Sequence, residues 1–329
     1  MNDLKKLLLR ELNKRKYSGM AQYEIEALYA FSRSYISETL TSLEKNNTII
    51  RKNNGKLTKR MWLIEYYPDV IDNYIRIGIL KSSEYSLFLS LVNEINDKKI
   101  KIIPYNNTVD LMNAIVNNAL EFALSPVFSQ IIFSLTNSNI LMLGPVSSGG
   151  SFIMENNMDN NIFYTSEVSS MMLFTGEFFK RNSDITIRTY SNPLNGSKEF
   201  ENNGKYIAIW EPYASSIQDK GYKIINDYKS LMDDDPCCFI STNKYYYADN
   251  KKFVDDLISK YKNYNKFDNS ILAYISKITK IKKSIIEKSL HNYNFKLKFD
   301  LNDMKIYIKK LGIIISDEKL KDMYIDYKN

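Results

Sequence analysis

The stretch YIAIWEPYAS, residues 206–215, carries the clearest structural signal in the chain. Residues 206–210 form a short, largely apolar run typical of a buried strand, and Pro212 can begin a helix directly after it. A strand that leads straight into a helix is the repeating unit of α/β sheets. The stretch therefore predicts an α/β domain in which Trp210 and Glu211 lie at the carboxyl end of a strand.

Strand and helix patterns alternate on both sides of this stretch. The expected strands are 75–80, 100–103, 122–124, 140–143, 161–164, 185–190, 206–210, 222–225 and 237–241, and the expected helices include 86–95, 109–119 and 166–179. This alternation predicts a parallel sheet with right-handed crossovers. Because the rhythm restarts near residue 161 and a return strand follows at 237, we expect two lobes. Lobe I would span about 75–155 and 236–329, and lobe II about 156–235.

The first 67 residues follow a different pattern. We expect helices at about 4–14 and 22–29, a third helix after Ser32, and two strands, 48–52 and 56–64, around the turn residues 53–55. This is the order of a winged helix-turn-helix. The expected organisation is a winged helix-turn-helix DNA-binding domain at 1–67, a linker at 68–74 and a two-lobed ligand-binding domain at 75–329.

Positive charge is concentrated in the N-terminal region. The chain has a net charge of +7, and residues 1–64 alone hold 13 Lys and Arg against 6 Asp and Glu. A basic module beside a balanced remainder indicates a polyanionic partner, here double-stranded DNA. The residues expected to contact DNA are Arg33, Ser34, Ser37, Glu38, Thr41, Arg51, Lys52, Lys56, Lys59 and Arg60. A homodimer is expected because one module contacts few bases. Alternatively, the winged helix makes protein contacts.

Two family resemblances accompany these patterns. The run AQYEIEALYAFSRSYISETLTSLEKNNTIIRK, residues 21–52, resembles the MarR-type winged helix, although Ala30 and Asn47 replace two usual glycines. The segments EFALSPVFSQ (121–130), GPVSSGG (144–150), YIAIWEPYAS (206–215) and SILAYISKITKIKKSIIEKSL (270–290) resemble type II periplasmic binding proteins of the sulfonate, nitrate or thiamine-pyrimidine precursor group. The second resemblance implies a small-molecule cleft between two lobes.

Candidate ligand-binding residues lie where the expected strands end, since ligands of open α/β sheets bind beyond the carboxyl ends of strands. They are Lys81, Ser82, Ser83, Asn106, Thr108, Ser125, Ser147, Ser148, Thr165, Ser166, Trp210 and Glu211. Such groups suit an anionic ligand or a nitrogen heterocycle, and an aromatic plane beside a carboxylate suits a flat or cationic one. Alternatively, the Ser and Thr residues only cap helices, and Trp210 and Glu211 only pack and cap.

The sequence predicts no catalytic set, cofactor or metal site. Its two cysteines, Cys237 and Cys238, are adjacent, and neighbours on a strand point to opposite faces, which makes joint chelation difficult. Cys237-Cys238-Phe239 resembles the cysteine-rich stretch of fungal thiamine-pyrimidine synthases, which implies an active-site histidine and iron. The single histidine, His291, lies in the C-terminal tail instead. We therefore expect a protein that is not an enzyme.

The leading hypothesis is a cytoplasmic, ligand-responsive transcriptional regulator. No signal peptide or membrane span is evident, and two cysteines fit a reducing compartment. The winged helix would bind DNA, and a small-molecule effector would bind between the lobes. Two alternatives remain open: an enzyme similar to thiamine-pyrimidine synthase, and an intracellular solute-binding or interaction protein.

Overall fold

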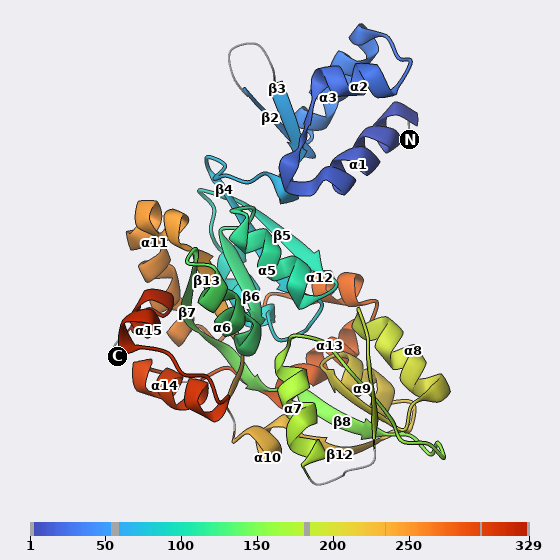
Figure 1. Ribbon diagram of the computed structural model, residues 1–329, viewed down its shortest axis with the longest axis vertical. Coiled ribbons are helices and arrows are strands. Elements are labelled where there is room, and N and C mark those ends of the chain that lie inside the picture. The colour runs from blue at the N-terminus through green and yellow to red at the C-terminus, as the bar shows by residue number, and fades with distance from the viewer. Residues whose placement is uncertain (1–2, 54–58, 181–184, 234, 297, 328–329) are drawn as a thin grey trace. The chain divides into compact units, whose positions relative to one another are not determined.

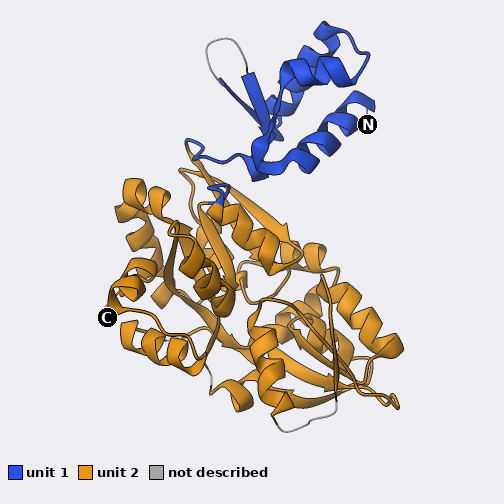
Figure 2. Cartoon of the chain, viewed as in Figure 1, with its two compact units in different colours: residues 1–72, 117–120 blue, residues 73–116, 121–329 orange. Residues whose placement is uncertain are grey.

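The computed structural model describes residues 3–53, 59–180, 185–233, 235–296 and 298–327. The chain divides into two compact units (Figure 2). The N-terminal unit comprises residues 1–72 and the short segment 117–120, and the C-terminal unit comprises 73–116 and 121–329. No described helix is both long and apolar enough to cross a membrane.

The described part of the N-terminal unit contains three α-helices and a three-stranded antiparallel sheet. The helices are α1 (Asp3–Arg15), α2 (Gln22–Leu28) and α3 (Arg33–Lys45), and the strands β1 (Met20–Ala21), β2 (Ile49–Asn53) and β3 (Lys59–Leu63) pair in the order β1-β3-β2. Ser32 caps α3 by accepting a hydrogen bond from the Tyr35 backbone N–H. Leucines of α1 and the apolar face of α3 share one buried core. The turn expected at 53–55 lies partly, and Lys56 wholly, outside the described residues.

The first lobe of the C-terminal unit is built on a six-stranded sheet of order β14-β7-β13-β6-β4-β5 (Figure 1). Its strands are β4 (Tyr74–Leu80), β5 (Lys99–Tyr105), β6 (Phe122–Pro126), β7 (Ile140–Gly149), β13 (Pro236–Asn243) and β14 (Tyr293–Asn294). β4 runs parallel to β5 and β6, whereas β13 pairs antiparallel with β6 and β7. The expectation of a parallel sheet is therefore wrong, because the chain returns from the second lobe through β13 in the opposite direction.

The second lobe contains a five-stranded sheet of order β10-β9-β11-β8-β12. Its strands are β8 (Ser151–Glu155), β9 (Ile162–Thr165), β10 (Thr186–Thr189), β11 (Tyr206–Trp210) and β12 (Lys223–Asp227). Sequence patterns missed β8, so this lobe begins at 151 rather than 156. Gly149 and Gly150 mark the passage from β7, and both have positive φ.

Helices cover both sheets. In the first lobe they are α4 (Ser86–Asn93), α5 (Thr108–Val116) and α6 (Val127–Thr136), and in the second α7 (Ser170–Phe179), α8 (Pro193–Asn203), α9 (Tyr213–Gln218) and α10 (Tyr228–Met232). The C-terminal part adds α11 (Lys244–Asn263), α12 (Asn269–Thr279), α13 (Lys283–Ser289), α14 (Leu301–Lys310) and α15 (Asp317–Met323). α11 and α15 pack on β7 of the first lobe, whereas α13 contacts α9 of the second lobe.

A buried ion pair joins β4 to the start of β6. The Arg76 guanidinium donates to both carboxylate oxygens of Glu121, at 2.7 and 3.1 Å, and the Arg76 backbone N–H donates to the same carboxylate. Both side chains are almost wholly excluded from solvent. The pair fixes the register of the strand that leads to the loop containing Ser82, Ser83 and Glu84.

Candidate functional site

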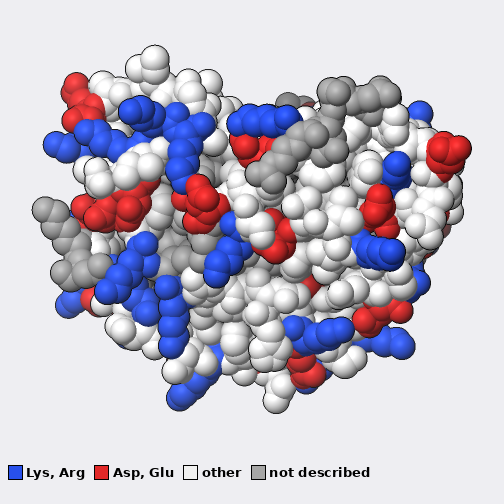
Figure 3. Space-filling view, turned by 90° about the horizontal axis from the view of Figure 1, so that it is seen from below, with Lys and Arg blue, Asp and Glu red and all other residues white. Residues whose placement is uncertain are grey.

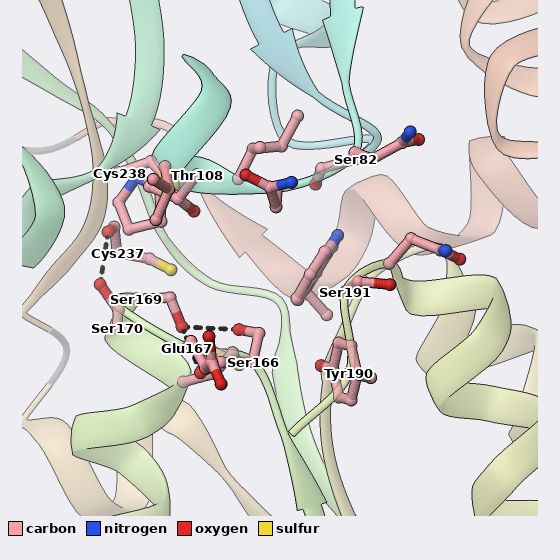
Figure 4. A pocket seen from close by; sticks show the side chains of 18 of the residues that line it. Ser82, Thr108, Ser166, Glu167, Ser169, Ser170, Tyr190, Ser191, Cys237 and Cys238 are labelled. Atoms are coloured by element: carbon pink, nitrogen blue, oxygen red, sulfur yellow. Dashed lines mark hydrogen bonds between the residues drawn. The ribbon is translucent and has the colours of Figure 1, made fainter. Parts of the chain in front are cut away.

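A cavity of about 330 Å³ lies in the C-terminal unit, lined by residues of both lobes. This volume is within the range of about 300–1,000 Å³ that small-molecule sites occupy. Figure 4 shows Ser82, Thr108 and Cys238 on one side, with Ser166, Glu167 and Tyr190 opposite. The described lining is Leu80, Ser82, Glu84, Tyr85, Asn106, Asn107, Thr108, Val109, Asp110, Pro126, Ser166, Glu167, Ser169, Ser170, Met171, Tyr190, Ser191, Asn192, Trp210, Cys237 and Cys238.

One side of the cavity, here called the thiol wall, consists of Glu84, Cys237 and Cys238. Glu84 follows β4 and both cysteines lie in β13, so the first lobe supplies all three. One Glu84 oxygen and the two Sγ atoms lie within 4.8 Å of one another. The expectation that the adjacent cysteines point apart is therefore wrong. The pairing of β13 with β7 shifts register on both sides of Cys238, and such a bulge breaks the alternation of side chains.

The carboxyl group of Glu84 is buried, and the described residues of the cavity lining offer it no cationic partner. Burial raises the pKa of Glu84 to about 7, although a hydrogen bond from the Ser147 hydroxyl to Oε1 (2.7 Å) opposes the rise. Burial also raises the pKa of the Cys238 thiol well above its usual value. In the thiol wall, burial therefore raises the free energy of the charged forms of Glu84 and Cys238.

The opposite side, here called the aromatic wall, consists of Trp210, Tyr190, Ser166 and Ser169 of the second lobe. The indole N–H of Trp210 donates to the Lys81 carbonyl oxygen at 3.0 Å, and the Tyr190 hydroxyl donates to the Ala208 carbonyl oxygen at 2.7 Å. The two ring centroids lie 6.1 Å apart. Because both polar ends are already bonded, the rings present fixed faces rather than free donors.

The charge of the cavity lining is one-sided. Among the described residues that line it, three carry carboxyl groups, Glu84, Asp110 and Glu167, and none is Lys, Arg or His. Lys81, the one cationic residue among the predicted ligand-binding residues, is outside the lining and donates to the Asn106 side-chain oxygen at 2.7 Å. The lining therefore suits neutral or cationic groups better than anionic ones.

The structure brings together five of the twelve expected ligand-binding residues. Ser82, Asn106, Thr108, Ser166 and Trp210 line the cavity, whereas Lys81, Ser83, Ser125, Ser147, Ser148, Thr165 and Glu211 do not. Ser147 and Ser148 were expected in a loop after a strand ending at 143, but β7 continues to Gly149 and buries both. The hydroxyl of Ser125 is hydrogen-bonded to Gln130, and that of Thr165 accepts from Thr175.

Glu211 has a supporting position behind the aromatic wall. Its carboxylate accepts hydrogen bonds from the Ser215 backbone N–H (2.9 Å), the Ser215 hydroxyl (2.7 Å) and the Asn292 side-chain amide (2.6 Å). Burial raises the pKa of Glu211, and the bonds from Ser215 oppose that shift. The expected pairing of an indole with a carboxylate in the cavity is therefore not present, and Glu211 instead anchors the start of α9.

Sequence reasoning missed Glu84, Ser169, Tyr190 and the two cysteines as lining residues. Glu84 lies in the same loop as Ser82, and this proximity was the available signal for it. Tyr190 follows β10 in a loop for which the sequence predicts no ligand-binding residue. The cysteines were excluded by strand alternation, and nothing in the sequence indicated the bulge. His291, relevant to the enzyme alternative, is exposed and outside the lining.

The arginines expected to contact DNA are engaged within the N-terminal unit. Arg33 donates to Glu26 at 3.0 Å and Arg51 to Glu44 at 2.5 Å, while Arg60 donates to the Ser18 carbonyl oxygen. Ser34, Ser37, Glu38, Thr41, Lys52 and Lys59 are exposed. Figure 3 shows a face on which Lys and Arg are interspersed with Asp and Glu, and it does not identify residues of the N-terminal unit.

Comparison with known proteins identifies the fold. Neither a protein-family model nor a curated protein matches the sequence. Among solved structures, a ligand-binding component of an ABC-type import system from Staphylococcus aureus, with zinc bound, matches 77% of this chain and 96% of its own at 17% identity and a TM-score of 0.64. The alkanesulfonate-binding protein SsuA from Xanthomonas axonopodis pv. citri, bound to MOPS, covers 74% of this chain and 92% of its own at 13% identity and 0.59.

A third match is the periplasmic nitrate-binding protein NrtA from Synechocystis PCC 6803. It covers 77% of this chain and 86% of its own at 8% identity, with a TM-score of 0.56. These comparisons give no support to the MarR-type resemblance of the N-terminal region.

The comparisons correct the functional prediction. The DNA-binding transcriptional regulator is wrong, because the matched chains are a ligand-binding component of an import system and proteins named for binding alkanesulfonate or nitrate, in agreement with the solute-binding alternative. Double-stranded DNA is no longer supported as a partner. The homodimer was expected because it would bind paired DNA sites, and that reason no longer applies. The cytoplasmic location is also contradicted, because matched proteins include periplasmic ones. The chain has, in its two-lobed α/β part, the periplasmic-binding-protein-like fold.

Proposed function

We propose that this chain is a solute-binding protein whose C-terminal unit holds one small molecule between the thiol wall and the aromatic wall. The observation that carries the proposal is the cavity itself, which both lobes line with hydroxyl, amide and carboxyl side chains around aromatic rings. Sites that combine aromatic rings with oriented polar groups bind small organic molecules through apolar contact and take their specificity from hydrogen bonds. The chemistry is binding rather than catalysis.

The solute that this cavity favours is neutral or cationic and has a flat part. Three lining carboxyl groups, and the absence of Lys, Arg and His among the described lining residues, disfavour a sulfonate or nitrate, even though two of the matched proteins are named for those anions. The face of Trp210 supports stacking of a planar or cationic group. The hydroxyl groups of Thr108 and Ser166 support hydrogen bonding to the edge of a heterocycle, whereas the Ser82 hydroxyl already donates to the Glu211 carbonyl oxygen at 3.0 Å.

Two measurements on the purified full-length chain test this function. Native mass spectrometry should detect a co-purified small molecule, or the chain should gain thermal stability with members of a set of neutral and cationic nitrogen heterocycles. Matched sulfonates, including MOPS, and nitrate should give no stabilisation. Stabilisation by the anions alone would contradict the proposed solute class, and no response to any compound would contradict the solute-binding function.

For the N-terminal unit, we propose a winged helix-turn-helix arrangement that serves as an interaction module of the solute-binding protein. The order α1, α2, α3, β2, β3 and the antiparallel pairing of β2 with β3 support this arrangement. The internal ion pairs of Arg33 and Arg51 favour protein contact over phosphate contact. Cross-linking of the full chain to a co-purified protein through residues of this unit is the expected result, and cross-links confined to the C-terminal unit would contradict it.

A further inference from the structure

The thiol wall brings together three side chains of the types that bind metal ions. One oxygen of Glu84 and the Sγ atoms of Cys237 and Cys238 lie within 4.8 Å of one another. In a tetrahedral zinc site, bonds of about 2.3 Å to sulfur and about 2.0–2.2 Å to oxygen place neighbouring ligand atoms about 3.5–4 Å apart. Small side-chain rotations therefore suffice to bring the three atoms onto one cation.

The local backbone explains how adjacent cysteines share a site. Cys238 pairs with Pro126 of β6 and with Ser147 of β7, and the register to β7 shifts both before and after it. A bulge at this point re-aims one side chain relative to a regular strand. Both cysteines then line the same cavity, and both are almost fully buried.

We propose that Glu84, Cys237 and Cys238 form a binding site for one thiophilic divalent cation of the Zn²⁺ type, with the remaining coordination position open to the cavity. Two thiolates favour zinc-like ions over Mg²⁺ or Ca²⁺, which prefer oxygen ligands. Three protein ligands and one open position are the arrangement of zinc sites that exchange a water or a small ligand. The assignment rests on these three side chains and does not depend on the identity of the solute.

Surrounding groups hold the three ligands in place. The Ser147 hydroxyl donates to Glu84 Oε1 at 2.7 Å, which leaves further lone pairs on the carboxylate for a cation. The Tyr85 hydroxyl lies 3.4 Å from Cys238 Sγ, and the Ser170 hydroxyl donates to the Cys237 carbonyl oxygen at 2.9 Å. Hydrogen bonds of this kind orient metal ligands and limit their rotation.

Charge supports the same assignment. No Lys, Arg or His is among the described residues that line the cavity, so none of these residues can neutralise a charged Glu84. A divalent cation would offset two of the three negative charges that the deprotonated ligands carry. Buried charges require such pairing or coordination.

The composition of the chain makes the proposal directly testable. Cys237 and Cys238 are its only cysteines, and His291 is its only histidine. The experiment adds Co²⁺ to reduced, chelator-treated full-length protein under anaerobic conditions. The expected result is one Co²⁺ per chain, with thiolate-to-cobalt charge-transfer absorption and the visible bands of a tetrahedral ion, all lost when Zn²⁺ is added.

Single substitutions separate the three ligands. Cys237→Ser and Cys238→Ser should each weaken Co²⁺ binding by at least about tenfold and reduce the charge-transfer band. Glu84→Gln should weaken binding to a similar degree while the band persists at saturation. Glu177→Gln, a surface carboxylate paired with Lys180, is the matched control and should bind as the parent does. Circular dichroism of each variant establishes that it is folded.

A second readout needs no variant. Zn²⁺ should slow the reaction of both thiols with a thiol reagent in the parent protein, and Mg²⁺ should not. The proposal is overturned if Co²⁺ gives no charge-transfer band, if all three substitutions leave binding unchanged, or if Zn²⁺ leaves the thiol reaction rate unchanged. Because these readouts report the ion alone, their failure leaves the heterocycle-binding test of the proposed function unaffected.

Discussion

The two walls of the cavity differ in chemistry and in how they are built. The thiol wall comes from the six-stranded sheet and holds a buried carboxyl group and two buried thiols, with no Lys, Arg or His beside them among the lining residues that the structure describes. The aromatic wall comes from the five-stranded sheet, and the polar ends of its rings are already hydrogen-bonded. The thiol wall therefore holds buried acidic groups that a bound cation would stabilise, whereas the aromatic wall offers a flat apolar surface. A ligand of this cavity must be compatible with both walls.

The largest expected effect concerns the support of the thiol wall. Glu121→Ala would remove the carboxylate partner of the buried Arg76 guanidinium in β4, the strand that leads to Glu84. Removing one partner of a buried ion pair costs about 3–5 kcal/mol, and we expect that loss in the free energy of unfolding. Chemical denaturation of the parent and the variant measures it.

The matched control for this substitution is Glu177→Ala. Glu177 forms an exposed pair with Lys180, and exposed pairs contribute less than about 1 kcal/mol. If Glu121→Ala cost no more than Glu177→Ala, the buried pair would not be a support of this wall.

The next effect concerns the support of the aromatic wall. Glu211→Ala would leave the Ser215 backbone N–H and the Asn292 amide without their acceptor. Buried donors left unsatisfied cost about 1–3 kcal/mol, so we expect a loss of about 2 kcal/mol in the free energy of unfolding. Glu167→Ala, which changes an exposed carboxylate, should lose much less. Equal losses in thermal or chemical unfolding would contradict the supporting role of Glu211.

The contribution of Glu211 to the free energy of unfolding is expected to decrease as pH rises. Its folded-state pKa is raised, so the folded chain retains a proton that the unfolded chain has lost. The stability that this carboxyl group contributes is full below its ordinary pKa of 4.5 and declines as pH rises through the folded-state value. Unfolding measured at several pH values should therefore show a larger cost of Glu211→Ala at acid than at neutral pH. A cost that grew with pH would contradict this.

Sequence patterns predicted much of the framework and less of the site. The strand at 206–210 and the helix after it were expected at their observed positions because a short apolar run and a proline define both ends. β8 and the extension of β7 escaped notice, since Ser147 to Ser151 resemble a loop in composition. Buried in strands, such residues satisfy their backbone groups by pairing, which composition does not reveal.

The site also depends on features that only tertiary structure creates. Trp210 and Glu211 are neighbours in sequence, yet one faces the cavity and the other is turned to Ser215 and Asn292, a partner 81 residues away. Similarly, the strand bulge that joins Cys237 and Cys238 in one wall arises from pairing with β7.

A smaller effect is expected for ligand binding through the aromatic wall. Trp210→Ala should weaken binding of the heterocycle that most stabilises the parent by about tenfold, or about 1.4 kcal/mol, because the stacking surface is lost. Trp210→Phe should retain most of the affinity. Calorimetry measures the affinities of both variants, and an unchanged affinity for Trp210→Ala would contradict a role of the aromatic wall in ligand binding.

The smallest effect concerns the exposed carboxylate of Glu167. Its side chain accepts a hydrogen bond from Thr189 at 2.7 Å and lines the cavity beside Ser166. Glu167→Gln should reduce affinity for a cationic heterocycle by about 0.5 kcal/mol, since exposed charge interactions are weak, and should not affect a neutral analogue. The same titrations measure this, and an equal loss for both ligands would argue against an electrostatic contribution.

The most direct test uses the intrinsic fluorescence of Trp210. The chain has two tryptophans, and Trp62→Phe leaves Trp210 as the single reporter in the cavity. Titration of this variant with neutral and cationic heterocycles should change its emission saturably, while matched sulfonates and nitrate should not. Emission that responds to the anions alone, or to none of the compounds, would contradict a solute site between these two walls.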